Sequence, residues 1–128
     1  MDFFLPTIRD IEQIRETMKK NTKQACEMSS ANIVLWARHY NTEIAFLNGE
    51  IIFRSKRSDG NYSYSCDLLD AKDARYLFDS IFSIAKEENG ALRMHCMTRQ
   101  EYSMIELWYP GTFQVVYDRD GADYIYDR

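Results

Sequence analysis

Apolar positions at near-helical spacing predict two helices at the start of the chain. The first is expected to run from Thr7, which can cap it, to about Lys20. Its apolar stripe consists of Ile8, Ile11, Ile14 and Met18. After a polar stretch at 21–24, Ser29 or Ser30 can cap a second, shorter helix. Four residues share the face of this helix that is expected to lie on the core: Ile33, Trp36, Ala37 and Tyr40.

Alternating residues then predict an antiparallel meander of three strands. A strand at 42–47 leads into Asn48-Gly49, which tolerate the positive φ of a tight hairpin turn, and residues 51–53 open the return strand. Residues 58–61 form a second turn. The third strand has an apolar face made of Tyr62, Tyr64 and Cys66 and a polar face made of Ser63, Ser65 and Asp67.

A long helix, a strand, a shorter helix and a last strand follow the meander. Asp70 is expected to cap the long helix and Asn89-Gly90 to end it. Its core stripe consists of Ala74, Leu77, Phe78, Ile81, Phe82 and Ala85. The next strand alternates Leu92, Met94 and Cys96 with Arg93, His95 and Met97. Thr98 and Glu101 then have the spacing of a capping box for a helix that Pro110-Gly111 ends.

The last clear strand holds Phe113, Val115 and Tyr117, and a turn at 118–121 leads to a closing segment at 124–126. The order ααβββαβαβ predicts a mixed α/β (α+β) fold. The strand at 92–96 is expected to join the meander in parallel after the long helix has crossed the sheet. A length of 128 residues suits a single domain, 1–128.

Charge and cysteine content narrow the classes of function. The formal net charge of −4 gives no electrostatic reason to bind nucleic acid. Three widely spaced cysteines, Cys26, Cys66 and Cys96, suggest neither a disulfide framework nor a zinc site, so reduced thiols and a cytoplasmic location are expected. No stretch approaches the roughly 20 apolar residues of a membrane helix, and we expect no direct membrane insertion.

Two motifs resemble a known bacterial family. One is Glu27-x-Ser29-x-x-Asn32-x-x-x-Trp36, and the other is Arg119-Asp120-x-x-Asp123-Tyr124-x-Tyr126. Together with Tyr40 and the segment from Pro110 to Phe113, they resemble the N-terminal half of the family related to the C-terminal catalytic region of phosphatidylglycerol lysyltransferase. Members of that family carry two tandem domains of the acetyltransferase-type fold known as GNAT, which is also the order of elements predicted above.

The resemblance implies that this chain is the first of two GNAT-like domains. Family members continue beyond the position of Arg128 into a second domain with the expected active site. The implied partner is therefore a second GNAT-like domain of the same or a longer protein, and a homodimer is a possible substitute.

The loop before the long helix argues against a cofactor in this chain. An acyl-CoA acetyltransferase of this fold needs glycines there, so that bare backbone N–H groups can cradle a pyrophosphate. Residues 66–71 contain no glycine, and Asp67 and Asp70 add negative charge. We expect no cofactor and no catalytic residue in this chain.

Other candidate chemistry is sparse. His39 and His95 are far apart without metal-ligand spacing, so we expect no metal site; His39 is read as a helix-end residue and His95 as an outward strand residue. Trp36 and Trp108 lie on apolar helix stripes and are expected in the core.

The C-terminal segment is the candidate interdomain or binding surface, with a plain surface turn as an equal alternative. The surface comprises Trp108, Phe113, Arg119, Asp123, Tyr124 and Tyr126.

Three functions remain open. The first is a non-catalytic domain that supports an acyl- or aminoacyltransferase domain outside this chain. The second is an independent binding or regulatory domain. The third is an acyl-CoA-dependent N-acetyltransferase with a degenerate phosphate loop.

Overall fold

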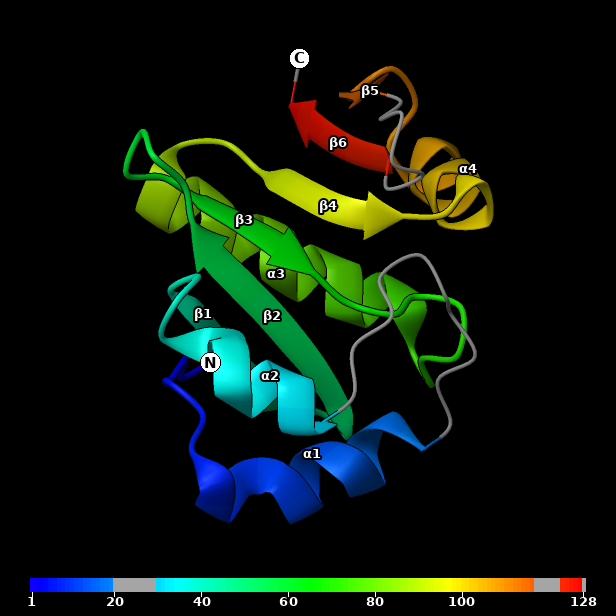
Figure 1. Ribbon diagram of the computed structural model, residues 1–128. Helices are drawn as coiled ribbons and strands as arrows, with labels where there is room; N and C mark the ends of the chain where they lie inside the picture. The colour runs from blue at the N-terminus through cyan, green and yellow to red at the C-terminus, as the bar shows by residue number, and fades with distance from the viewer. Residues whose placement is uncertain (20–29, 117–122, 128) are drawn as a thin grey trace.

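A six-stranded mixed sheet organises the part of the chain that the computed structural model describes, namely residues 1–19, 30–116 and 123–127 (Figure 1). The strands are β1 Thr42–Leu47, β2 Glu50–Lys56, β3 Tyr62–Ser65, β4 Arg93–Met97, β5 Phe113–Val116 and β6 Asp123–Asp127. Their order across the sheet is β1-β2-β3-β4-β6-β5. The helices are α1 Ile11–Met18, preceded by a 3-10 turn at Ile8–Asp10, α2 Ser30–Ala37, α3 Ala74–Asn89 and α4 Arg99–Trp108.

The predicted order of elements is confirmed as far as β5, and so are the directions predicted for the meander and for β4. β1, β2 and β3 form the antiparallel meander, and β4 joins β3 in parallel after α3. The closing segment is a further strand, however, because β6 pairs with both β4 and β5 and lies between them. The expectation that Phe113 to Tyr117 forms the last clear strand is therefore wrong.

The hairpin between β1 and β2 follows directly from its turn residues. Asn48 and Gly49 both have positive φ, 55° and 81°, as a two-residue hairpin turn with the twist of the flanking strands requires. The register from Leu47 and Glu50 to Thr42 and Ser55 is uninterrupted.

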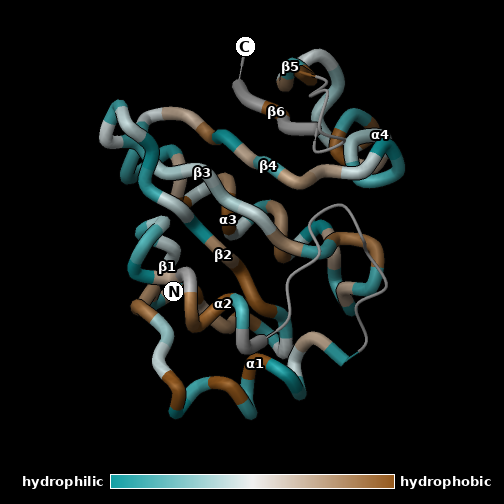
Figure 2. The backbone as a smooth tube through the Cα atoms, in the orientation of Figure 1, coloured by the Kyte–Doolittle hydropathy of each residue, from teal (hydrophilic) through white to brown (hydrophobic). Residues whose placement is uncertain are grey.

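Helices cover both faces of the sheet. Ile51 packs in a cluster with Ile14 of α1, Ile33 of α2 and Ile44 of β1. Ile52 faces the opposite way, into the larger core beneath α3 and α4. Because successive strand residues point to opposite faces, two adjacent buried isoleucines require cover on both sides. Figure 2 shows the matching pattern in α1, whose tube alternates between hydrophobic and hydrophilic positions.

Cover on both faces of the sheet also buries the polar side of β3. Tyr64 and Cys66 are buried as predicted, but Ser63, Ser65 and Asp67 on the other side of the strand are buried too. Tyr62 is only half-buried. β3 therefore carries a buried polar stripe.

Two helix ends differ from the sequence expectation. Asp73 caps α3 and accepts a hydrogen bond from the Tyr76 amide at 3.0 Å, so the prediction that Asp70 is the cap is wrong. α2 ends at Ala37, which leaves Tyr40 exposed in the turn that follows. Ile33 and Ala37 are buried as predicted; the Trp36 side chain and the predicted caps and helix end at 20–29 lie outside the described residues.

The predicted alternation along β4 fails at Cys96. Cys96 has a φ of 58°, and the pairing with β6 shifts between Met94 and Met97. The resulting bulge turns Met97 into the larger core instead of leaving it beside Arg93 and His95.

The cysteines also differ from the expectation of three reduced thiols. Cys66 is a buried free thiol, whereas Cys96 is disulfide-bonded. Disulfides are rare in cytosolic proteins. The cysteines therefore no longer support the cytoplasmic location, which stays a prediction. In the described ranges, none of the helices is long and apolar enough to cross a membrane.

Candidate functional site

The candidate site lies at the carboxyl ends of the parallel strands β3 and β4. These strands share a single registered pair, Tyr64 with Met94, whereas the β1–β2 ladder is continuous. In open α/β sheets, ligands bind outside the carboxyl ends of parallel strands. Residues 66–73 leave β3 at this end and lead into α3.

Carboxylates from three parts of the chain accept hydrogen bonds from the backbone of 66–73. Oε2 of Glu101 accepts from the Leu68 amide at 2.9 Å. Oδ1 of Asp67 accepts from the amides of the next two residues, Leu69 at 2.8 Å and Asp70 at 3.4 Å. Oε1 of Glu50 accepts from the Lys72 amide at 3.4 Å. The three acceptor residues are all buried. We call this arrangement of Glu50, Asp67 and Glu101 around 66–73 the carboxylate loop.

Glu101 is held in place by the capping box of α4. Its Oε1 accepts from the amide and the hydroxyl of Thr98, both at 3.0 Å, and the Thr98 hydroxyl accepts from the Glu101 amide. The predicted capping box is therefore confirmed. The other carboxylate oxygen of Glu101 accepts the hydrogen bond from the loop after β3. The residue is 0% exposed.

Asp67 lies in surroundings that disfavour its charged form. Burial and the neighbouring Asp70 carboxyl raise the pKa of Asp67 to about 6, against the opposing effect of the two backbone hydrogen bonds. Its Oδ2 is buried without a hydrogen-bond partner. A neutral carboxyl loses less on burial than a carboxylate, so this environment favours the protonated form.

The carboxylate loop has the chemistry opposite to that of a phosphate cradle. A phosphate at this position would need backbone N–H groups that point outward and surroundings free of negative charge. Here the amides of Leu68, Leu69, Asp70 and Lys72 already donate to carboxylates of the chain itself. Among the residues that the structure describes, no cluster of three His, Cys, Asp or Glu side chains is suited to a metal ion.

His95 is not the outward residue that the strand pattern predicts. Its ring is half-buried, and Nδ1 lies 2.7 Å from the hydroxyl of Ser63 on β3. Sequence reasoning missed this pair because 32 residues separate its members and only the parallel pairing brings them together. His39 is exposed and stacks edge-on against Tyr40.

The structure divides the predicted C-terminal surface. Phe113 is 0% exposed and packs in the larger core, so its assignment to a surface is wrong. Trp108 is half-buried, as a residue at the rim of the core against Phe78. Asp123, Tyr124 and Tyr126 belong to β6, but their side chains, like the whole of Arg119, lie outside the described residues.

Exposed apolar side chains gather instead near the N-terminus. Ile8 and Leu35 are 79% and 72% exposed, and both line a groove between the start of the first helix and α2. The remaining lining residues are Pro6, Thr7, Arg9, Val34 and Arg38. We call this the N-terminal groove.

Comparison with known proteins shows the fold alone. No family model and no curated protein matches the sequence. The crystal structure of a conserved protein of unknown function from Bacteroides thetaiotaomicron is similar, with a TM-score of 0.78 and 21% sequence identity over 93% of this chain. The match covers 40% of that protein, so this chain spans about two fifths of its length. The chain thus has a mixed α+β fold that also occurs within a considerably longer protein.

Proposed function

We propose that this chain is a non-catalytic GNAT-like domain of an acyl- or aminoacyltransferase related to phosphatidylglycerol lysyltransferase, and that it supports a catalytic domain outside this chain. The order of elements favours a GNAT-like fold, since an antiparallel meander is followed by a long crossing helix and a parallel strand. The similarity to two fifths of a longer protein supports a role as one part of a larger molecule.

The carboxylate loop is the observation that carries the non-catalytic assignment. In an active acyl-CoA transferase of this fold, the loop between the meander and the long helix presents free backbone amides to a pyrophosphate. In this chain, four amides of the corresponding segment donate to Glu50, Asp67 and Glu101. Displacing these side chains would leave buried carboxylates unpaired, and that cost opposes cofactor binding.

Calorimetric titration with acetyl-CoA tests this assignment. We expect no measurable binding by the unmodified chain. The double variant Asp67→Asn and Glu101→Gln removes two negative charges but retains an acceptor oxygen at each position, so it is also expected not to bind. Micromolar binding by the unmodified chain would contradict the proposal and favour the acetyltransferase alternative.

The partner domain is proposed to contact the C-terminal side of the sheet. β5 is the outermost strand on this side, and Trp108 lies at the rim of the core that β5 closes. Edge strands offer backbone groups to a neighbour. Without the partner, the isolated chain is expected to self-associate here. Tyr124→Ser combined with Tyr126→Ser should then reduce any dimer, which analytical sedimentation would measure. A strict monomer whose two tyrosines are buried within their own chain would rule out this surface.

A further inference from the structure

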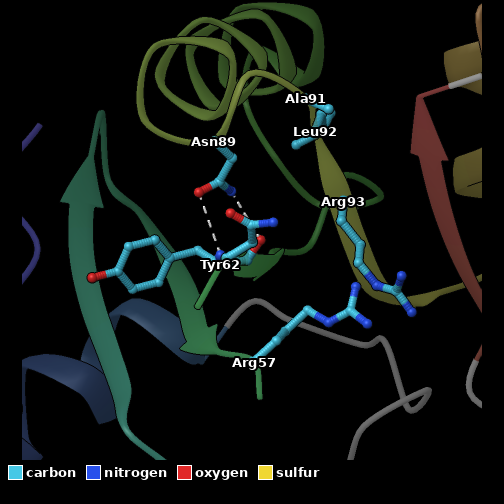
Figure 3. Close-up of a pocket in the computed structure, with 7 residues that line it drawn as sticks. Arg57, Tyr62, Asn89, Ala91, Leu92 and Arg93 are labelled. Atoms are coloured by element: carbon cyan, nitrogen blue, oxygen red, sulfur yellow. Dashed lines mark hydrogen bonds between the residues drawn. The ribbon is translucent and has the colours of Figure 1, made fainter. Parts of the chain in front are cut away.

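Two cavities of the described chain differ in size and lining. The N-terminal groove has a volume of about 590 Å³, and its lining is mainly apolar. The other cavity has a volume of about 180 Å³ and lies where β3 and β4 begin. Figure 3 shows the Asn89 side chain at the end of α3 in its wall, where the Asn89 amide group donates to the Tyr62 carbonyl at 3.1 Å. The groove therefore has room for several side chains of a partner, whereas the smaller cavity does not.

Exposed apolar side chains concentrate around the N-terminal groove. In the part of the chain that the structure describes, eight large hydrophobic side chains are exposed, and six of them belong to residues 1–8 or 35–40. Ile8 and Leu35 are the most exposed of these six, and both line the groove. On the other side of the same two helices, Ile14 and Ile33 are buried in the cluster against the sheet. The first helix and α2 thus each carry a further apolar position that this chain leaves uncovered.

The charged residues that line the groove are both basic. Arg9 and Arg38 are exposed, and neither forms an ion pair with any residue that the structure describes. The acidic residues that follow Arg9 are already engaged. The Asp10 carboxylate accepts from the amide and the hydroxyl of Thr7 at 2.7 and 3.3 Å, and Glu12 forms an ion pair within its own helix. Because α2 contains no acidic residue, the groove is a local positive region on a chain whose formal net charge is −4.

Both walls of the groove are helical, and this determines how a partner can bind. Helices satisfy most of their backbone hydrogen bonds internally, so an extended peptide finds no free strand edge here. Recognition therefore depends on side chains, as when an amphipathic helix places its i, i+3, i+4 and i+7 residues in a hydrophobic groove. A small molecule fits less well, because its sites bury roughly 70–90% of the ligand surface, and walls as open as Ile8 and Leu35 cannot enclose it.

From the combination of exposed apolar side chains and unpaired arginines we infer that the N-terminal groove is a docking site for an acidic amphipathic helix of a partner protein. Apolar side chains of that helix cover Ile8 and Leu35, and its carboxylates pair with Arg9 and Arg38. The site is separate from the carboxylate loop and independent of the proposed function.

An anionic membrane suits the groove less well than a helix does. Lipid headgroups are typically recognised by clusters of about four to eight basic residues, and only two line the groove. A membrane also faces a large part of the protein, whose net charge is negative. A single helix meets mainly the local charge, because screening limits electrostatic interactions to about 10 Å at 0.1 M salt.

Fluorescence anisotropy with synthetic peptides tests the site directly. The probe is a fluorescein-labelled peptide of about 15 residues, with leucines at i, i+3, i+4 and i+7, glutamates beside them and alanines elsewhere. We expect a saturable rise in anisotropy when the 128-residue chain is added. Two control peptides should bind roughly tenfold more weakly or worse: one with lysine in place of each glutamate, and one of unchanged composition whose leucines do not share a face.

Three outcomes would overturn the inference. The first is the absence of saturable binding by the acidic peptide. The second is equally strong binding of the peptide whose leucines do not share a face. The third is binding to phosphatidylserine vesicles without binding to the acidic peptide, which would identify a membrane surface instead.

Variants of the chain locate the binding. Ile8→Ser combined with Leu35→Ser should weaken binding of the acidic peptide roughly tenfold or more, through the loss of the apolar contact. Arg9→Gln combined with Arg38→Gln should weaken it by a similar factor and also reduce its dependence on salt. All four side chains are exposed, so the variants should fold like the unmodified chain, and circular dichroism checks this.

Matched substitutions elsewhere on the surface separate the groove from general stickiness or charge. Leu107→Ser changes an apolar side chain of α4 that is as exposed as that of Ile8, and Arg75→Gln removes one positive charge from an exposed position on α3. Neither residue lines the groove, so both variants should bind the acidic peptide as the unmodified chain does. Losses as large as those of the groove variants would refute the assignment of binding to this surface.

Discussion

Asp67 makes the folding stability depend on pH at the scale of a single residue. Folding raises its pKa from 3.8 to about 6, so between these values the folded state holds a proton that the unfolded state has lost. The free energy of unfolding therefore falls as the pH rises through this window. The stabilisation from the neutral carboxyl is fully present below about pH 4 and is lost above about pH 6.

Asp67→Asn should remove this dependence. Asparagine keeps an oxygen that can accept from the Leu69 and Asp70 amides, but it cannot ionise. We expect the variant to exceed the unmodified chain in free energy of unfolding at pH 8 by on the order of 1–3 kcal/mol, and to match it near pH 4. Urea unfolding at both pH values measures the difference. Asp59→Asn, in an exposed turn, is the control, and an identical profile for both variants would refute the role of Asp67.

Arg54 of β2 contacts four other parts of the chain. Its guanidinium lies between the rings of Phe3 and Tyr62, 4.1 and 4.0 Å from their centroids. It also pairs with Glu43 of β1 at 2.8 Å and with Glu88 of α3 at 2.6 Å. Only 11% of its side chain is exposed, so these contacts are poorly screened by solvent.

Arg54→Lys should lower the free energy of unfolding by about 1–3 kcal/mol, because lysine cannot stack between two rings while bonding to two carboxylates. Arg75→Lys provides the control, since the Arg75–Asp79 pair is exposed and 3.8 Å long, and it should cost less than about 0.5 kcal/mol. Thermal unfolding of both variants measures the contrast. If both variants lost the same free energy of unfolding, the position of Arg54 between the two rings would contribute nothing to stability.

Sequence reasoning at this scale recognised charge but not burial. Asp67 and Asp70 were predicted to repel phosphate from the chemistry of their side chains alone. The carboxylates that complete the loop are Glu50 and Glu101, which come from β2 and α4. Glu50 and Glu101 reach the loop only because of the way the sheet and the helices pack. No local sequence pattern predicts that contact.

At the scale of elements, Glu101 links the start of α4 to the loop after β3. Glu101→Ala should lower the free energy of unfolding by about 2–4 kcal/mol, because it leaves the buried Leu68 amide and the half-buried Thr98 amide without acceptors. Chemical denaturation measures this loss.

Asp73→Ala, which removes the exposed cap of α3, provides the comparison for Glu101→Ala. It should cost only about 1 kcal/mol. A loss for Glu101→Ala no greater than this would show that the contact with the loop is energetically unimportant.

Helices, strands and turns could be predicted from the sequence where the local residues determine the backbone conformation. Asn48-Gly49 fixed the hairpin because both residues accept positive φ. Asp70 and Asp73 are equally good caps in sequence, but Asp67 binds the Asp70 amide and holds that residue in the loop, so α3 begins after Asp73. The bulge at Cys96 and the insertion of β6 depend on pairing between distant strands.

At the scale of the whole molecule, the N-terminal groove brings two highly exposed apolar side chains, Ile8 and Leu35, into one surface. Ile8→Ser combined with Leu35→Ser should reduce the fluorescence of the dye ANS, which binds exposed apolar surface. Leu107→Ser is a matched control, because Leu107 is 79% exposed on α4 and does not line the groove.

Both the double variant and the Leu107 control should unfold at nearly the same temperature as the unmodified chain, since surface substitutions usually change stability by less than about 0.5 kcal/mol. An equal decrease in dye fluorescence in both proteins would show that the groove binds no more dye than a single exposed leucine.

The architecture was more predictable from the sequence than the N-terminal groove was. Hydrophobic periodicity defines which face of a helix or strand is buried, and this sufficed for the meander and for the parallel strand β4. The N-terminal groove combines the start of the first helix with α2, and these two segments are separated in sequence.

The short bridge between Phe4 and Ile44 has a consequence for how the protein can be handled. The two residues exchange backbone hydrogen bonds of 2.9 Å, and this contact covers the middle of β1 at the outer side of the sheet. A chain shortened by its first few residues would present a bare strand to other molecules. Such edges recruit strands from neighbouring chains. Shortened proteins should therefore aggregate during purification, and affinity tags are better attached at the other end.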